Sequence, residues 1–138
     1  MATRSYIGIR TENGTIIAAY CHCDGYLTYN GQMLVDHYQN VEDILDLVAL
    51  GSFSSLRETV EETATDDRNV DALTQWEPEE IEDTPEGIKA FFNNSDREYL
   101  YVYDVEVECW HYAEETYGRT TNGELKPLYA SLEEMELI

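Results

Sequence analysis

Two apolar stretches near the start of the chain alternate with the period of a β-strand. They span residues 5–10 and 15–23 and flank the pair Asn13-Gly14. An Asn-Gly pair between two such runs is the strongest short signal for a β-hairpin. The pattern therefore predicts an N-terminal hairpin.

A two-residue loop in this hairpin places His22 on the face that carries Ile7 and Ile9, because side chains alternate along each strand. We therefore expect His22 to be largely buried and to be hydrogen-bonded through the turn at Asp24-Gly25.

Apolar residues at helical spacing follow the hairpin. Residues 32–39 predict a short helix, and Asn40 then caps a second helix that ends near Gly51. A further helix is predicted to open at Pro85, which a first turn tolerates, and to run through Phe92.

Residues 57–86 are acidic and weakly periodic, and Pro78 and Pro85 interrupt any long helix. This composition predicts an acidic excursion from the domain, built of loop with helical fragments.

The C-terminal third returns to a period of two. Every second position from 99 to 107 is a tyrosine or a valine, which is the pattern of a strand. The pattern allows one long strand into residues 109–112 or two strands folded at Asp104. The tyrosine row is interpreted as one packed sheet face, since a stacking platform for single-stranded nucleic acid needs a basic groove.

A second Asn-Gly pair predicts a turn over residues 121–124 and a final strand over residues 125–129. Ser131 with Glu134 is a minimal capping box for a C-terminal turn. The complete order predicts an α+β fold in a single domain, residues 1–138, with one antiparallel sheet of four or five strands and helices packed on one face.

Net charge is the strongest compositional signal: 29 acids against 8 lysines and arginines give a formal charge of −21. Such a field repels phosphate backbones and anionic membranes and favours basic partners. Residues 58–86 alone carry twelve acids and one base. The candidate partner-binding carboxylates are therefore Glu58, Glu61, Glu62, Asp66, Asp67, Asp71, Glu77, Glu79, Glu80, Glu82, Asp83 and Glu86.

The start of the chain lacks the apolar run of a signal peptide, and no stretch approaches the ~18 apolar residues of a membrane span. We expect a cytoplasmic protein whose three cysteines are reduced thiols. The sequence contains no cofactor motif.

The segment Tyr20 to Gly31 concentrates the unusual chemistry of the chain. Its candidate functional residues, which we name the motif loop, are His22, Asp24, Tyr26, Tyr29 and Asn30. Two alternatives remain beside a structural role for them. A zinc site could pair Cys21 and Cys23 with Cys109 and His111, although ligands two apart on a strand lie about 6.5–7 Å from each other. A small hydrolase could use a cysteine with His22 and Asp24.

Several of these positions also resemble a group of small phage and prophage proteins of unassigned function. The resemblance covers the first 56 residues and lies in Met1–Ser5, Tyr20–Tyr26, Asn30-Gly31, His37-Tyr38 and Leu50–Leu56. It implies a phage setting, in which small acidic proteins often block host enzymes.

These observations favour a non-enzymatic inhibitor of the DNA-mimic kind. It would offer carboxylates to the basic nucleic-acid-binding groove of a host restriction, CRISPR or other nucleic-acid enzyme. A phage accessory protein that binds a host protein by shape, with acidity serving solubility, is the alternative. A small Cys/His enzyme or zinc protein is the third, and a homodimer stays open.

Overall fold

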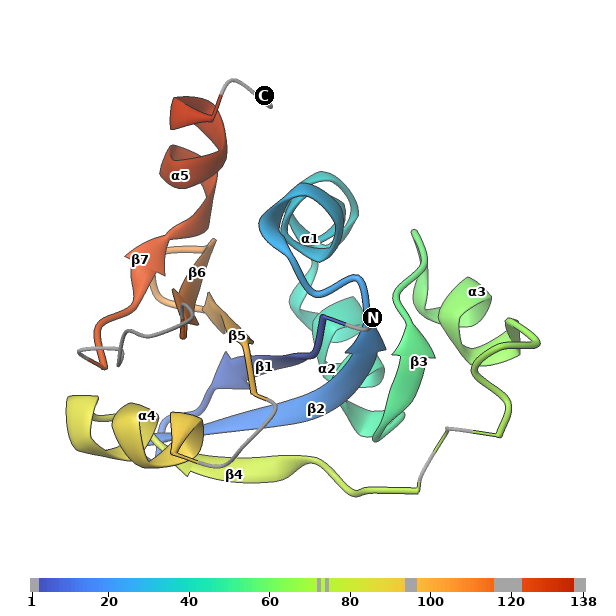
Figure 1. Cartoon of the computed structure of the whole chain (residues 1–138), viewed down its shortest axis with the longest axis horizontal. Helices are drawn as coiled ribbons and strands as arrows, with labels where there is room; N and C mark the ends of the chain where they lie inside the picture. The colour runs from blue at the N-terminus through green and yellow to red at the C-terminus, as the bar shows by residue number, and fades with distance from the viewer. Residues whose placement is uncertain (1–2, 72, 74, 94–96, 116–122, 136–138) are drawn as a thin grey trace.

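Seven strands form one mixed sheet in the computed structural model, which describes residues 3–71, 73, 75–93, 97–115 and 123–135 (Figure 1). The strand order is β3-β2-β1-β5-β6-β7, and β4 also pairs with β2. The strands are β1 (Ser5–Arg10), β2 (Thr15–Cys23), β3 (Phe53–Ser55), β4 (Glu79–Glu82), β5 (Tyr99–Asp104), β6 (Cys109–Glu114) and β7 (Lys126–Pro127). The helices are η1 (Leu27–Gly31), α1 (Gln32–His37), α2 (Val41–Ala49), α3 (Val60–Thr65), α4 (Pro85–Phe92) and α5 (Leu128–Glu134).

The prediction of a purely antiparallel sheet of four or five strands is wrong. Two antiparallel hairpins, β1–β2 and β5–β6, lie side by side because β1 pairs in parallel with β5. A second parallel pairing joins β2 to β3. The chain therefore makes long crossovers before it returns to each parallel neighbour, as parallel strands require.

Helices cover both faces of the sheet, so the expectation of helices on one face is also wrong. One core contains Ile7 and Tyr101 with residues of α1, α2 and α5. The other contains Ile16 and Leu100 with residues of α4. The central strands therefore bury side chains on both faces.

The N-terminal hairpin is confirmed, but its register differs by one residue from the expected one. Ile9 faces Ile17, because Thr11 closes a three-residue loop by donating its backbone N–H to Thr15 O at 2.9 Å. Gly14 provides the left-handed residue that this loop length needs, with φ of +76°. Every face assignment on β2 shifts accordingly.

Local signals predicted the helix starts well. Asn40 Oδ1 accepts a hydrogen bond from Glu42 N at 2.8 Å at the start of α2, and Thr84 Oγ1 accepts from Gly87 N at 3.0 Å at the start of α4. Within the excursion over residues 57–86, α3 is the expected helical fragment, whereas β4 was not foreseen.

The C-terminal predictions had mixed outcomes. Two strands separated at Asp104 replace the single-strand alternative, and the tyrosine row is a packed face, with Tyr101 and Tyr103 buried. The strand expected over residues 125–129 is confirmed only at Lys126–Pro127, as β7, because Leu128 begins α5. Ser131 consequently lies inside that helix and caps nothing. The predicted turn over residues 121–124 falls partly outside the described residues.

None of the helices in the described part of the chain is long and apolar enough to cross a membrane.

The turn at Gly14 gives a direct test of the hairpin. A Cβ atom on Gly14 would meet no atom within 4 Å, so a substitution there changes only the backbone preference. We expect Gly14→Val to lower the free energy of unfolding by about 1 kcal/mol or more, because a β-branched residue resists positive φ. Urea unfolding measures it, with Gly14→Asn as the milder control; equal stability of all three proteins would contradict the turn.

Candidate functional site

Backbone contacts tie the motif loop to the end of the sheet. Gly25 N donates to Thr3 O at 2.8 Å, and the buried Tyr101 hydroxyl donates to Gly25 O at 2.6 Å. Asn30 is fully buried, and its amide donates to Ser5 Oγ at 3.1 Å and to Cys21 Sγ at 3.4 Å. These contacts give the loop a structural role.

The other motif-loop residues divide between contact and exposure. Asp24 adopts a positive φ of 61° where the chain leaves β2. The Tyr29 hydroxyl donates to Leu56 O at 3.3 Å and accepts from Arg57 Nη1 at 3.2 Å. Tyr26 is exposed. The loop therefore places one aromatic side chain in solvent and uses the others to join β2 to the segment after β3.

His22 does not lie on the face that the sequence suggested. The one-residue register difference puts it on the opposite face from Ile7 and Ile9, where it is only partly buried. Its Nδ1 lies 2.7 Å from the Tyr20 hydroxyl instead of bonding through the Asp24-Gly25 turn. The expected burial was wrong because an error of one residue exchanges the two faces of a strand.

The zinc alternative fails on geometry. Cys21 belongs to the core that contains Ile7, whereas Cys109 and His111 alternate with core residues of β6 and face the other side of the sheet. β2 and β6 are also separated by two strands, which places them about 14 Å apart. In the described residues, no three His, Cys, Asp or Glu side chains gather as metal ligands.

The nucleophile alternative also lacks its parts. Cys21 and His22 point to opposite faces of β2, and burial raises the pKa of the Cys21 thiol to about 12. Cys109 Sγ lies 4.0 Å from His111 Nδ1, but burial and then the Asp104 carboxylate raise the pKa of that thiol. A reactive cysteine needs a lowered pKa, so neither pair is an activated nucleophile.

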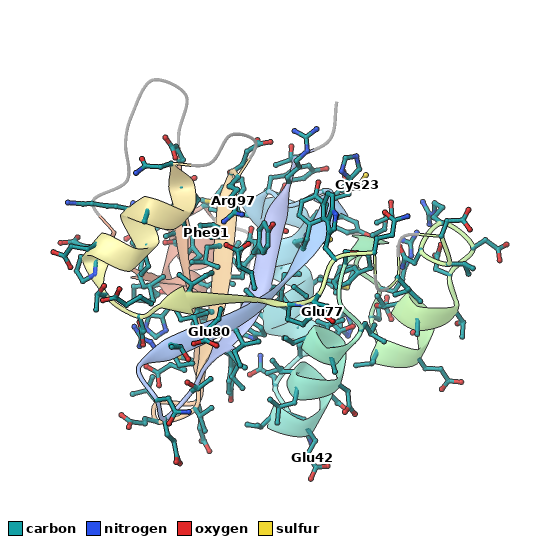
Figure 2. The ribbon with its side chains drawn as sticks, turned by 90° about the horizontal axis from the view of Figure 1, so that it is seen from below. Cys23, Glu42, Glu77, Glu80, Phe91 and Arg97 are labelled. Carbon is teal, nitrogen blue, oxygen red and sulfur yellow. The ribbon has the colours of Figure 1, made fainter. Side chains whose placement is uncertain are left out.

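The acidic residues gather along one edge of the sheet. The chain leaves β3, forms α3 and returns as β4, which pairs with the same side of β2 as β3 does (Figure 1). Figure 2 shows Glu80 on β4 and Glu77 beside the start of that strand. Nine of the twelve predicted carboxylates are exposed; we call them the acidic edge, and they are Glu58, Glu61, Glu62, Asp67, Asp71, Glu77, Glu80, Glu82 and Glu86.

The other three predicted carboxylates are engaged inside the molecule. Asp66 Oδ2 accepts from Arg57 Nε at 2.7 Å, and Glu79 Oε2 accepts from Arg97 Nη2 at 2.8 Å. Asp83 Oδ2 lies 2.8 Å from Arg10 Nε. Glu79 and Asp83 fasten the segment to residues next to or in the sheet, and Asp66 pairs within the segment itself. All three are therefore structural and are removed from the candidate binding set.

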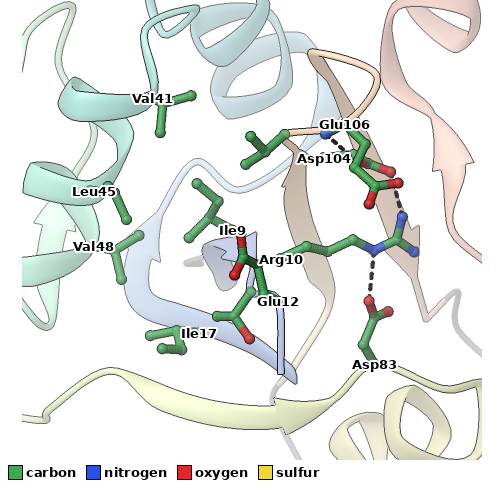
Figure 3. A pocket seen from close by; sticks show the side chains of 12 residues that line it. Ile9, Arg10, Glu12, Ile17, Val41, Leu45, Val48, Asp83, Asp104 and Glu106 are labelled. Atoms are coloured by element: carbon green, nitrogen blue, oxygen red, sulfur yellow. Dashed lines mark hydrogen bonds and ion pairs between the residues drawn. The ribbon is translucent and has the colours of Figure 1, made fainter. Parts of the chain in front are cut away.

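Sequence reasoning missed an apolar groove of about 580 Å³ between α2 and the end of the β1–β2 hairpin (Figure 3). Its apolar lining is Ile9, Ile17, Val41, Leu45, Val48 and Val105, and its charged lining is Arg10, Glu12, Asp83, Asp104 and Glu106. The helical spacing of α2 was foreseen, but the groove that this helix lines was not. Asp46, which follows Leu45 directly, was the available signal that this position lies near solvent.

No protein-family model, no curated protein and no solved structure matches the chain. The acidic edge and the groove are therefore the two features from which a function can be inferred.

The three thiols should differ in reactivity. Because Cys21 is buried and its pKa is raised to about 12, we expect it to resist alkylation in the native protein at pH 8. Cys23 should react first and Cys109 more slowly, since both are partly exposed but the pKa of Cys109 is raised. Iodoacetamide pulses followed by peptide mass spectrometry measure this, and denatured protein provides the control. Fast native modification of Cys21 would contradict its placement.

Proposed function

We propose that this protein is a non-enzymatic inhibitor that binds the basic, nucleic-acid-binding groove of another protein through its acidic edge. In the phage setting that the sequence resemblance implies, that partner is a host defence enzyme in the cytoplasm. The observation that carries the proposal is the exposure of nine carboxylates in the segment that leaves β3 and returns along β2 as β4. Exposed carboxylates in one strip attract a basic surface and repel nucleic acid.

Basic side chains neutralise little of the negative charge of the acidic edge. Residues 58–86 contain a single base, Arg68, whose side chain is 66% exposed and lies 3.3 Å from Asp66. Arg57, Arg97 and Arg10 approach the segment, but each is paired with one of its three internal carboxylates. The outward-facing charge of the segment therefore stays strongly negative.

The spacing of the carboxylates supports partial mimicry of a DNA strand. The whole surface of 7720 Å² carries a formal charge of −21, whereas duplex DNA concentrates one charge into about 100 Å². Over residues 77–83, about 20 Å of chain carries three unpaired carboxylates, or one per ~7 Å, against one phosphate per ~3.4 Å on each DNA strand. Residues 77–83 thus provide about half the linear charge of one DNA strand.

Acidic residues at the other side of the sheet do not contribute to this strip. Glu133 and Glu134 lie on α5, which packs beside β6 at the other side of the sheet (Figure 1). The proposed binding surface is therefore the acidic edge and not the whole acidic molecule.

Neutralising the edge should weaken binding to the partner without unfolding the protein. We expect Glu77→Gln, Glu80→Gln and Glu82→Gln together to slow association strongly, with a smaller effect on dissociation. All three residues are exposed, and within the described part of the chain none of them forms an ion pair with a base. Surface plasmon resonance against the partner captured from host lysate, over a salt series, measures both rates. Glu79 and Asp83 are kept, since Glu79 pairs with Arg97 and Asp83 is one of the two carboxylates that hold Arg10.

The matched control removes the same formal charge away from the acidic edge, through Asp36→Asn on α1 and Glu133→Gln and Glu134→Gln on α5, all of them exposed. Equal losses in the two triple variants would show that only net charge matters. A complex insensitive to salt would contradict charge mimicry and favour recognition by shape, with acidity serving solubility.

A further inference from the structure

The groove beside α2 exposes apolar side chains that a finished core would bury. Leu45 is 50% exposed and Val105 is 43% exposed, although both line the same hollow as the core residues Ile9 and Val48. Contiguous exposed apolar surface of this kind marks an interaction site more often than chance packing. A volume of about 580 Å³ falls in the usual range of binding clefts.

Carboxylates surround this apolar floor. Glu12 and Glu106 lie at the hairpin turn and at the β5–β6 turn, and both are exposed (Figure 3). Glu80 pairs across from Ile17, which places its side chain on the same face. The rim is therefore negative on several sides.

Arg10 is the one base among the residues that line the groove, and it leaves the charge of the rim negative. Arg10 Nη1 donates to Asp104 Oδ2 at 2.7 Å, and Arg10 Nε lies 2.8 Å from Asp83 Oδ2. Two carboxylates therefore hold one guanidinium in place. The lining contains four acids, Glu12, Asp83, Asp104 and Glu106, against this single base.

We propose that this groove binds a basic amphipathic helical segment of a partner protein. Apolar side chains of the segment fill the floor between Val41, Leu45 and Val105, and lysines or arginines at neighbouring positions meet the carboxylates of the rim. This is the helix-in-groove mode of recognition, in which side chains at i, i+3, i+4 and i+7 anchor the segment. The proposal rests on the apolar floor and on the acids that line it, and Glu80 is the one carboxylate named here that also belongs to the acidic edge.

The charge of the rim argues against other occupants. It repels nucleic acid and anionic lipid headgroups. A second copy of this chain brings a formal charge of −21 and the same acidic groove. Basic charge with an apolar face is the chemistry that complements an apolar floor and an acidic rim together.

A synthetic peptide of lysine and leucine tests the proposal. The probe is about 14 residues long, near the length at which isolated helices become stable, with leucines at helical spacing. A scrambled peptide of identical composition is the control for charge. We expect isothermal titration calorimetry at physiological salt to give binding at least about tenfold tighter for the amphipathic peptide. Equal affinity of the two peptides would overturn the proposal.

Matched variants locate the binding site. Leu45→Ser with Val105→Ser removes apolar surface from the groove, and Val70→Ser with Met135→Ser removes comparably exposed apolar side chains elsewhere. We expect the groove variant to lose about tenfold in affinity for the amphipathic peptide and the control variant to keep it. An unchanged groove variant overturns the proposal.

A measurement on the unmodified protein covers the case of a variant that does not fold. Amide chemical-shift changes on peptide addition should concentrate at Ile9, Ile17, Val41, Leu45, Val48 and Val105. Changes confined to α3 and the outer side of β4 would instead assign the peptide to the acidic edge and refute the groove. Neither experiment uses the captured partner, so failure here leaves the test of the acidic edge unaffected.

Discussion

The parallel pairing of β1 with β5 determines the arrangement of the whole molecule. Ser5 through Ile9 pair with Tyr99 through Tyr103, so two segments separated by more than ninety residues lie in adjacent strands. β1 forms a hairpin with β2, and β5 forms a hairpin with β6. The chain between these two hairpins must therefore form the crossover that makes β1 and β5 parallel. Closing so long a loop costs conformational entropy, and burial of Ile7, Tyr101 and Val102 on the two faces offsets it.

Features set by neighbouring residues were predictable from the sequence. Asn40 and Thr84 cap helices through their own next turn, and Asn13-Gly14 closes a hairpin, because each depends on a few consecutive residues. The loop length of that hairpin was not predictable with the same certainty: Gly14 at positive φ serves both two-residue and three-residue loops. The difference of one residue moved His22 to the other face.

Features set by distant residues were not predictable. The pairing of β4 was missed because Glu79–Glu82 contains one apolar side chain, Ile81, and becomes a strand only by facing Ile16 of β2. The acidic segment itself was visible in composition, but its ion pairs were not. Arg10 and Asp104 are 94 residues apart in the sequence. The groove depends on the same long-range geometry, since α2, β2 and the β5–β6 turn each contribute one wall.

The position of β4 also has a consequence for solubility. Among the described strands, β4 pairs only with β2, so its outer backbone groups could accept a further strand. Edge strands of this kind can pair with the edge strand of another molecule through backbone hydrogen bonds, and natural proteins often protect them with charged side chains. Glu80 and Glu82 stand at this edge in exposed positions. The carboxylates proposed to recognise a partner thus stand where like charges on two copies of the protein would repel each other, which disfavours pairing of their edge strands.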